Sequence, residues 1–217
     1  MKEFILIIIA YLLGSIPTAL IISRKYFGID IREYGSGNMG ATNTFRVLGS
    51  RYGTIVMVFD ILKGMFAVSL FTFLPHYLSN ELDRTNFMIG LGLAAVLGHV
   101  FPIFADFKGG KGVATLFGMI LAVQPVVAIS CVGVFLLVLY LTRYVSLSSI
   151  LGALMLPISV LWIWNENEVM YRIFTLLVAF MVIITHQKNI SRILRGVESR
   201  VPILKHRDRK KARRFDS

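Results

Sequence analysis

Long apolar runs alternate with short polar segments along nearly the whole chain. A helix that crosses the hydrocarbon core of a membrane needs about 20 predominantly apolar residues. The apolar runs cover residues 4–22, 54–74, 87–105, 113–123, 126–142, 145–164 and 169–185. This pattern predicts an all-α protein, a polytopic membrane helical bundle of about seven transmembrane helices.

Two of these runs leave an alternative open. Residues 113–142 are too long for one helix, and Gln124-Pro125 divides them, because a proline lacks the amide donor that a continuous helix needs. The first half is unusually short, so hydropathy alone gives five spans if the flanking segments are re-entrant. Residues 4–22 are too long for the apolar region of a signal peptide and are interpreted as a retained helix.

Composition supports a membrane protein and excludes several other classes. Hydrophobic residues make up 56% of the chain and charged residues 16%, and the mean hydropathy is +0.71. A soluble domain has about 25% charged residues, and a disordered chain is poor in large apolar residues. The one cysteine, Cys131, excludes a disulfide scaffold.

The net charge of +11 is unevenly distributed. Eleven of the 23 Lys and Arg residues lie between Lys188 and Arg214, where a basic tail beside an apolar segment is attracted to anionic lipid rather than to nucleic acid. With seven spans, 19 basic residues fall on one side and only Lys2 and Arg84 on the other. The positive-inside rule then predicts the N-terminus outside and the C-terminus in the cytoplasm. We expect one integral-membrane domain over residues 1–200 and a basic cytoplasmic tail over residues 201–217.

Three polar segments on the predicted inner side carry the candidate chemistry. The first, residues 34–46, combines glycines that permit tight turns with hydrogen-bonding side chains and an arginine that can hold a phosphate. Its candidate binding residues are Ser36, Gly37, Asn38, Thr42, Asn43 and Arg46. An ordinary Gly/Asn turn before a helix is the alternative, and the spacing of a P-loop is lacking.

In the second segment, residues 98–115, Lys111 stands among Gly109, Gly110 and Gly112, directly before the short helix. A glycine-rich loop that opens onto a helix N-terminus is suited to bind an anion, although a flexible basic loop facing lipid would look similar. We expect His99 to be a packed core residue.

The third segment, residues 185–198, places His186, Asn189 and Arg192 three residues apart, on one face if they are helical. The basic end of a membrane helix is the alternative. Ser149 adds a hydroxyl near the same surface, although serines in membrane helices also serve packing. We expect the three segments to converge on one membrane face. No acidic or Cys/His cluster has the spacing of a metal site.

These segments resemble, in order, the three signature motifs of the bacterial acyl-phosphate:glycerol-3-phosphate acyltransferases, the PlsY family. The resemblance is carried by residues 36–43, 98–115 and 186–198. Met39 stands where the family often has proline, and Gln187 where it often has arginine. Neither departure removes a group that the chemistry needs.

The resemblance implies that a long-chain acyl group passes from acyl phosphate to glycerol-3-phosphate. The products would be 1-acylglycerol-3-phosphate (lysophosphatidic acid) and phosphate, in the first acylation step of phospholipid biosynthesis. Ser36, Arg46 and Lys111 would bind phosphate. Ser149, His186 and Asn189 would hold glycerol-3-phosphate, with either His186 or the substrate's own phosphate as the base.

The same resemblance implies no cofactor and no metal. It places the chain in the bacterial cytoplasmic (inner) membrane as a multi-pass protein with its active site at the cytoplasmic face. Its partners would be both substrates and membrane lipid. We expect a monomer that acts downstream of an acyl-phosphate-forming enzyme.

A membrane transporter of a small phosphorylated or anionic metabolite is the competing function. Transporters also bind substrates with glycine-broken helices and charged loops. Their sites lie near the midplane between internal repeats, whereas these segments gather at one face and no repeat is detectable in the sequence.

Overall fold

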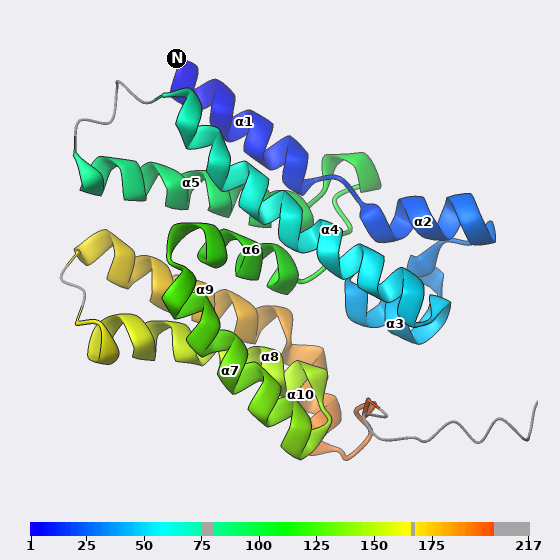
Figure 1. Cartoon of the computed structure of the whole chain (residues 1–217). Coiled ribbons are helices and arrows are strands. Elements are labelled where there is room, and N and C mark those ends of the chain that lie inside the picture. Colours follow the sequence, from blue (N-terminus) through cyan, green and yellow to red (C-terminus); the bar gives the residue numbers. More distant parts are fainter. Residues whose placement is uncertain (75–79, 166–167, 202–217) are drawn as a thin grey trace, which may run out of the picture.

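The computed structural model describes residues 1–74, 80–165 and 168–201, and all regular secondary structure in these ranges is helical (Figure 1). The α-helices are α1 (Lys2–Gly14), α2 (Thr18–Phe27), α3 (Ala41–Leu48), α4 (Ser50–Ser69), α5 (Glu81–Val100), α6 (Val113–Val123), α7 (Pro125–Thr142), α8 (Val145–Ile158), α9 (Val169–Thr185) and α10 (Gln187–Leu194). Short 3₁₀ turns η1 (Ile31–Glu33), η2 (Leu70–Phe73) and η3 (Ile103–Ala105) lie between them, and a π turn, η4 (Ser159–Ile163), extends α8 beyond Pro157.

The predicted membrane bundle is confirmed, with differences in individual spans. Five described segments are long and apolar enough to cross a membrane: Lys2–Phe27, Ser50–Phe73, Glu81–Ala105, Pro125–Thr142 and Val145–Ile163. The pair α9 and α10 makes a sixth if it is counted as one span bent by 58°. Helix α6 has 11 residues and is shorter than a membrane span. The seven-span prediction counted both segments that flank Gln124-Pro125 as spans, and the five-span alternative counted neither. In the structure α7 is one of the five candidate spans, α6 is not, and α9 qualifies only together with α10.

The first span is broken, where a single helix over residues 4–22 was expected. Helix α1 ends at Gly14 and α2 begins at Thr18, after Pro17. Pro17 has no amide hydrogen to continue the helical hydrogen bonds. At the break, the Ile16 carbonyl accepts from the Thr18 amide at 3.1 Å and from the Lys63 ammonium at 3.3 Å. Residues 4–22 contain no charged residue, so a hydropathy profile gives no sign of the break.

Glycines bring two pairs of helices into backbone contact. Helix α4 packs against α6 through Gly64 and Gly118: a Cβ on Gly118 would lie 2.0 Å from the Ile61 carbonyl oxygen, and one on Gly64 would lie 2.1 Å from that of Thr115. Helices α1 and α5 meet in the same way at Gly14 and Gly98. Small residues permit this approach, which is typical of helix pairs in membranes.

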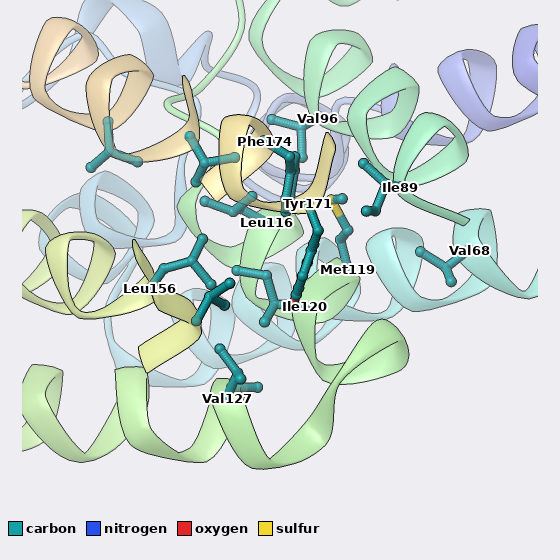
Figure 2. Packing of buried hydrophobic residues seen from close by; sticks show 14 of the residues in the cluster. Val68, Ile89, Val96, Leu116, Met119, Ile120, Val127, Leu156, Tyr171 and Phe174 are labelled. Carbon is teal, nitrogen blue, oxygen red and sulfur yellow. The ribbon is translucent and has the colours of Figure 1, made fainter. Parts of the chain in front are cut away.

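The main apolar core surrounds α6. Leu116, Met119 and Ile120 of α6 are buried, and Figure 2 shows them among Val96, Val127, Leu156, Tyr171 and Phe174. In Figure 1, α6 lies between a layer of α1, α4 and α5 and a layer of α7, α8 and α9. The central helix therefore fixes the loop that precedes it.

Helices α2, α3 and α10 lie at one end of the bundle, on the right in Figure 1, and the N-terminal ends of α1, α5 and α9 lie at the other. The polar segments thus gather at one end. Which end faces the cytoplasm stays a prediction, as does the division into a domain and a tail. Of the predicted tail, residues 202–217 lie outside the described part of the chain.

We expect Gly118→Ala to destabilise the bundle, because its new methyl group would meet the α4 backbone. Overpacking of this kind costs about 1–3 kcal/mol. Gly133→Ala on α7 is the matched control, since a Cβ there would meet nothing within 4 Å. Thermal unfolding in detergent should show a lower midpoint for Gly118→Ala and no decrease for Gly133→Ala. Equal midpoints would contradict the close contact of α4 and α6.

Candidate active site

The third segment forms a corner rather than a continuous helix, which corrects the single helical face expected for His186, Asn189 and Arg192. Helix α9 ends at Thr185, and α10 starts at Gln187. His186 lies at the corner, 3% exposed, and its Nδ1–H donates to the Val182 carbonyl oxygen at 2.8 Å. With the proton on Nδ1, the neutral ring keeps a lone pair on Nε2.

A buried carboxylate organises the residues that follow. Glu198 Oε1 accepts from Asn189 Nδ2 at 2.6 Å and from Ser146 Oγ at 2.8 Å, and Oε2 accepts from Arg192 Nε at 2.7 Å. The Glu198 side chain is only 6% exposed. Burial raises its pKa, but the hydrogen bonds from Arg192, Asn189 and Ser146 outweigh burial and hold the pKa below its usual value. Glu198 is therefore an anion at neutral pH.

Lys111 joins the second segment to this network. Its ammonium donates to Asn189 Oδ1, and its charge also acts on the His186 imidazole. Burial, together with the positive charges of Arg192 and Arg46, lowers the Lys111 pKa to about 8 even though Glu198 opposes the shift. A lysine in this state still carries its charge at neutral pH but holds it weakly.

The first segment reaches the same place through Arg46. Arg46 Nη2 donates to Ser199 Oγ at 2.5 Å, and Nη1 lies 3.4 Å from Asn43 Oδ1. Ser199 follows Glu198 directly, so all three segments meet around residues 198–199. The predicted convergence of the segments at one end of the bundle is confirmed by these contacts.

Asn43 serves the loop itself. It is 1% exposed, and its Oδ1 accepts from the Ser36 amide at 2.8 Å. Its Nδ2 donates to the Tyr34 carbonyl at 3.0 Å and the Ile31 carbonyl at 3.3 Å. Asn38 similarly accepts from the Gly40 amide at 2.8 Å. These two amides hold the turn, whereas Ser36, Gly37 and Thr42 are exposed around it.

The glycine loop differs from a simple phosphate cradle. The Gly109 amide donates to the Val100 carbonyl and the Gly110 amide to the His99 carbonyl, each at 3.1 Å. In the described part of the chain, no backbone hydrogen bond engages the amides of Lys111 and Gly112. Gly112 has φ +77°, a left-handed conformation that favours glycine, and it turns the chain into α6. These two amides are therefore the ones that could meet a ligand.

Ser149 is not brought into the network. Its hydroxyl donates to the Val145 carbonyl of its own helix at 2.9 Å. Ser146 is the serine of this helix that contacts the network. Sequence reasoning gave Glu198, Ser146 and Ser199 no role, and the available signal was an acidic residue two positions after Gly196 in an otherwise basic stretch.

The site as a whole carries more positive than negative charge. Arg46, Lys111 and Arg192 come from three distant parts of the chain. The charges of Arg192 and Glu198 act on Lys111, and Arg46 acts on Lys111 while donating to Ser199, the neighbour of Glu198. An excess of positive charge in a partly buried place favours an anionic ligand. Among the residues that the structure describes, no three His, Cys, Asp or Glu side chains are grouped as a metal site.

Comparison with known proteins identifies the family to which the chain belongs. The family profile described as glycerol-3-phosphate acyltransferase matches residues 4–196. The chain belongs to the glycerol-3-phosphate acyltransferase family. Among curated relatives, the glycerol-3-phosphate acyltransferase of Macrococcus caseolyticus is 43% identical over 94% of this chain and 100% of its own length. Glycerol-3-phosphate acyltransferase 2 of Bacillus cereus is 48% identical over 90% of this chain and 93% of its own length.

Solved structures agree. A crystal structure of PlsY (YgiH), an integral membrane glycerol 3-phosphate acyltransferase in its glycerol 3-phosphate form, has a TM-score of 0.82 and 39% identity, covering 93% of this chain and 96% of that one. The lysophosphatidic acid form of PlsY gives a TM-score of 0.78 at 38% identity, covering 92% and 95%. The predicted family is confirmed, and membership favours an acyltransferase over the alternative of a transporter.

The lowered pKa of Lys111 predicts a pH dependence of acyltransferase activity. A group whose pKa is about 8 loses its charge as the pH rises through 8, so kcat/KM, which reports the free enzyme, should fall above that pH. Lys111→Arg keeps its charge throughout this range and should lose the inflection. An unchanged inflection in Lys111→Arg would assign the titration to another group.

Proposed function

We propose that this chain transfers a long-chain acyl group from an acyl phosphate to glycerol-3-phosphate, giving lysophosphatidic acid and inorganic phosphate. The observation that carries the proposal is the meeting of Lys111 and Arg192 at Asn189 and Glu198, with Arg46 bound to the adjoining Ser199. Two phosphate groups take part in this reaction, and a site of cations and amides suits both. Family membership and the two PlsY forms support the acceptor and the product.

The reaction needs no covalent catalyst. An acyl phosphate is a mixed anhydride with a good leaving group already attached. The acceptor hydroxyl oxygen bonds to the carbonyl carbon, the bond from that carbon to the phosphate oxygen breaks, and phosphate leaves with the electron pair. The protein must align the two substrates and stabilise the charge that develops.

Each part of the site fits one of these tasks. Lys111 and Arg46, with Ser36 and the turn at Gly37, Asn38, Thr42 and Asn43, form the binding region for the leaving phosphate. The amides of Lys111 and Gly112, at the start of α6, supply donors for the oxyanion. Gly109 and Gly110 act by setting the position of this loop, since their amides are engaged.

Glycerol-3-phosphate would lie against His186, Asn189 and Arg192. Ser149, whose hydroxyl donates to Val145, would have to leave that carbonyl to bind it. Two proton acceptors fit the acceptor hydroxyl: Nε2 of His186, whose other nitrogen is committed to Val182, and the phosphate of glycerol-3-phosphate itself. Asn189 accepts from the Lys111 ammonium and donates to Glu198, and so it fixes the direction of the Lys111 side chain.

The site would face the cytoplasm of a bacterial inner membrane, where glycerol-3-phosphate is dissolved and the acyl chain can lie among the helices. The 19 predicted inner basic residues support this orientation. A monomer contains every residue assigned above. An enzyme that makes acyl phosphate must act before it.

The function is tested with purified protein in detergent. Palmitoyl phosphate should release phosphate only when glycerol-3-phosphate is present, and the activity should survive EDTA. Lys111→Ala and Arg46→Ala should each lower kcat about 100-fold, because a contact to developing charge is worth roughly 3 kcal/mol. Lys108→Ala, an exposed lysine of the same loop, is the matched control and should keep its activity.

Direct attack also predicts that no acyl-enzyme forms. Radiolabelled palmitoyl phosphate alone should leave no label on the denatured protein. Stoichiometric label that is released by hydroxylamine and chases into product would replace direct attack with a covalent intermediate.

The orientation is tested with single cysteines in a Cys131→Ser background. In intact cells an impermeant thiol reagent should label Glu81→Cys and leave Ser36→Cys and Ser199→Cys unlabelled until the cells are permeabilised. All three positions are exposed, so access to the reagent depends on the side of the membrane. Labelling of Ser199→Cys but not of Glu81→Cys would invert the topology.

A further inference from the structure

A second group of ionisable residues lies inside the helices, apart from the network around Glu198. Asp60 and Lys63 of α4 and His99 of α5 are 2%, 7% and 7% exposed. Lys63 Nζ lies 2.9 Å from Asp60 Oδ1, and His99 Nδ1 lies 3.5 Å from the same oxygen. Charged groups inside membrane helices are costly, and those that persist usually serve a function. The reaction proposed above uses none of these three side chains.

The group touches both of the first two polar segments. It lines a small cavity together with Ile16 and Pro17 from the break between α1 and α2, Met39 from the first segment, and Gly110 from the second. Lys63 also donates to the Ile16 carbonyl at 3.3 Å. The three side chains therefore lie where the broken first span meets the loop before α6.

The closest connection runs from His99 to the loop that carries Lys111. The Gly110 amide donates to the His99 carbonyl at 3.1 Å, and a Cβ on Gly110 would lie 2.0 Å from His99 Nε2. The imidazole thus lies directly against the residue before Lys111. On its other side, Nδ1 faces the Asp60 carboxylate and has no hydrogen-bond partner within the described residues. The position of the ring depends on that charge.

We propose that Asp60, Lys63 and His99 are positioning residues, which hold the loop at Gly110 so that Lys111 points at the leaving phosphate. The carboxylate fixes the imidazole, the imidazole supports Gly110, and Lys63 neutralises the carboxylate while tying it to the break at Ile16. This inference rests on the proposed role of Lys111. Small displacements of a catalytic group can lower turnover by as much as about 100-fold, so a group that does not touch substrate can control the rate in this way.

A kinetic double-mutant cycle tests the proposal, because residues that act through one another are not additive. Asp60→Asn should lower kcat roughly 10-fold or more when Lys111 is present. In a Lys111→Ala background, the same substitution should cause little further loss. A role in stability alone would give the same loss in both backgrounds, and so would overturn the proposal, as would wild-type kinetics for Asp60→Asn. No effect of Lys111→Ala itself would instead overturn the proposed function.

Asp60→Asn leaves Lys63 buried without its partner and can prevent folding. The double variant Asp60→Asn/Lys63→Met removes both charges and avoids this problem, since neutral replacement of a buried ion pair is often tolerated. We expect it to recover the thermal midpoint in detergent but not kcat, whereas a purely structural pair would recover both.

Ser130→Ala is the matched control. It removes another polar contact between helical segments, the 2.9 Å contact of Ser130 Oγ with Ser159 Oγ. We expect Ser130→Ala to leave kcat unchanged both in the wild-type and in the Lys111→Ala background.

Discussion

The site depends on one buried anion. Arg192 and Arg46 both act unfavourably on the charge of the partly buried Lys111, and the negative charge of Glu198 opposes this effect and pairs directly with Arg192. The chain brings Glu198 back by a sharp turn: Gly196 has φ +71°, and the Val197 amide donates to the Arg192 carbonyl at 2.9 Å. The corner at His186 and this turn together fold the segment around the carboxylate, and the cation excess that remains is what an anionic ligand meets.

The short central helix explains why these charges can serve a lipid substrate. At about 1.5 Å per residue, the 11 residues of α6 extend over about 16 Å, roughly half of a hydrocarbon core of about 30 Å. Its far end turns at Gln124 within the bundle, where the Tyr171 hydroxyl donates to the Gln124 side chain. The near end of α6 joins the loop that carries Lys111, whose ammonium donates to Asn189 of α10. In the proposed reaction, this arrangement would let a phosphate at Lys111 lie close to an acyl chain among the helices.

Hydropathy predicted the helices well because burial in lipid is a property of each run by itself. The bounds of residues 113–123 and 169–185 agree with α6 and α9. What hydropathy missed depends on partners elsewhere in the chain. Asn43 could have been a ligand residue, but four contacts within the protein occupy its amide. In the sequence Glu198 is one acid in a basic stretch. Its function as the shared acceptor of Ser146, Asn189 and Arg192 is visible only once α8 and the third segment are brought together.

The glycines before Lys111 show that the network around Glu198 and the cluster of Asp60, Lys63 and His99 act on different parts of the loop. Backbone flexibility would explain why glycine stands at positions 109 and 110 if both amides were open to a ligand. Both amides instead donate to carbonyls of α5. A Cβ at either position would lie 2.0 Å from an atom of His99, so closeness to α5 is what these positions require. The loop thus has its backbone fixed against His99 of the cluster of Asp60, Lys63 and His99, while the Lys111 side chain is directed by Asn189, which itself donates to Glu198. Fixing the backbone and the side chain from opposite sides leaves Lys111 few alternative positions, which is what a cation aligned with the leaving phosphate of an acyl transfer needs.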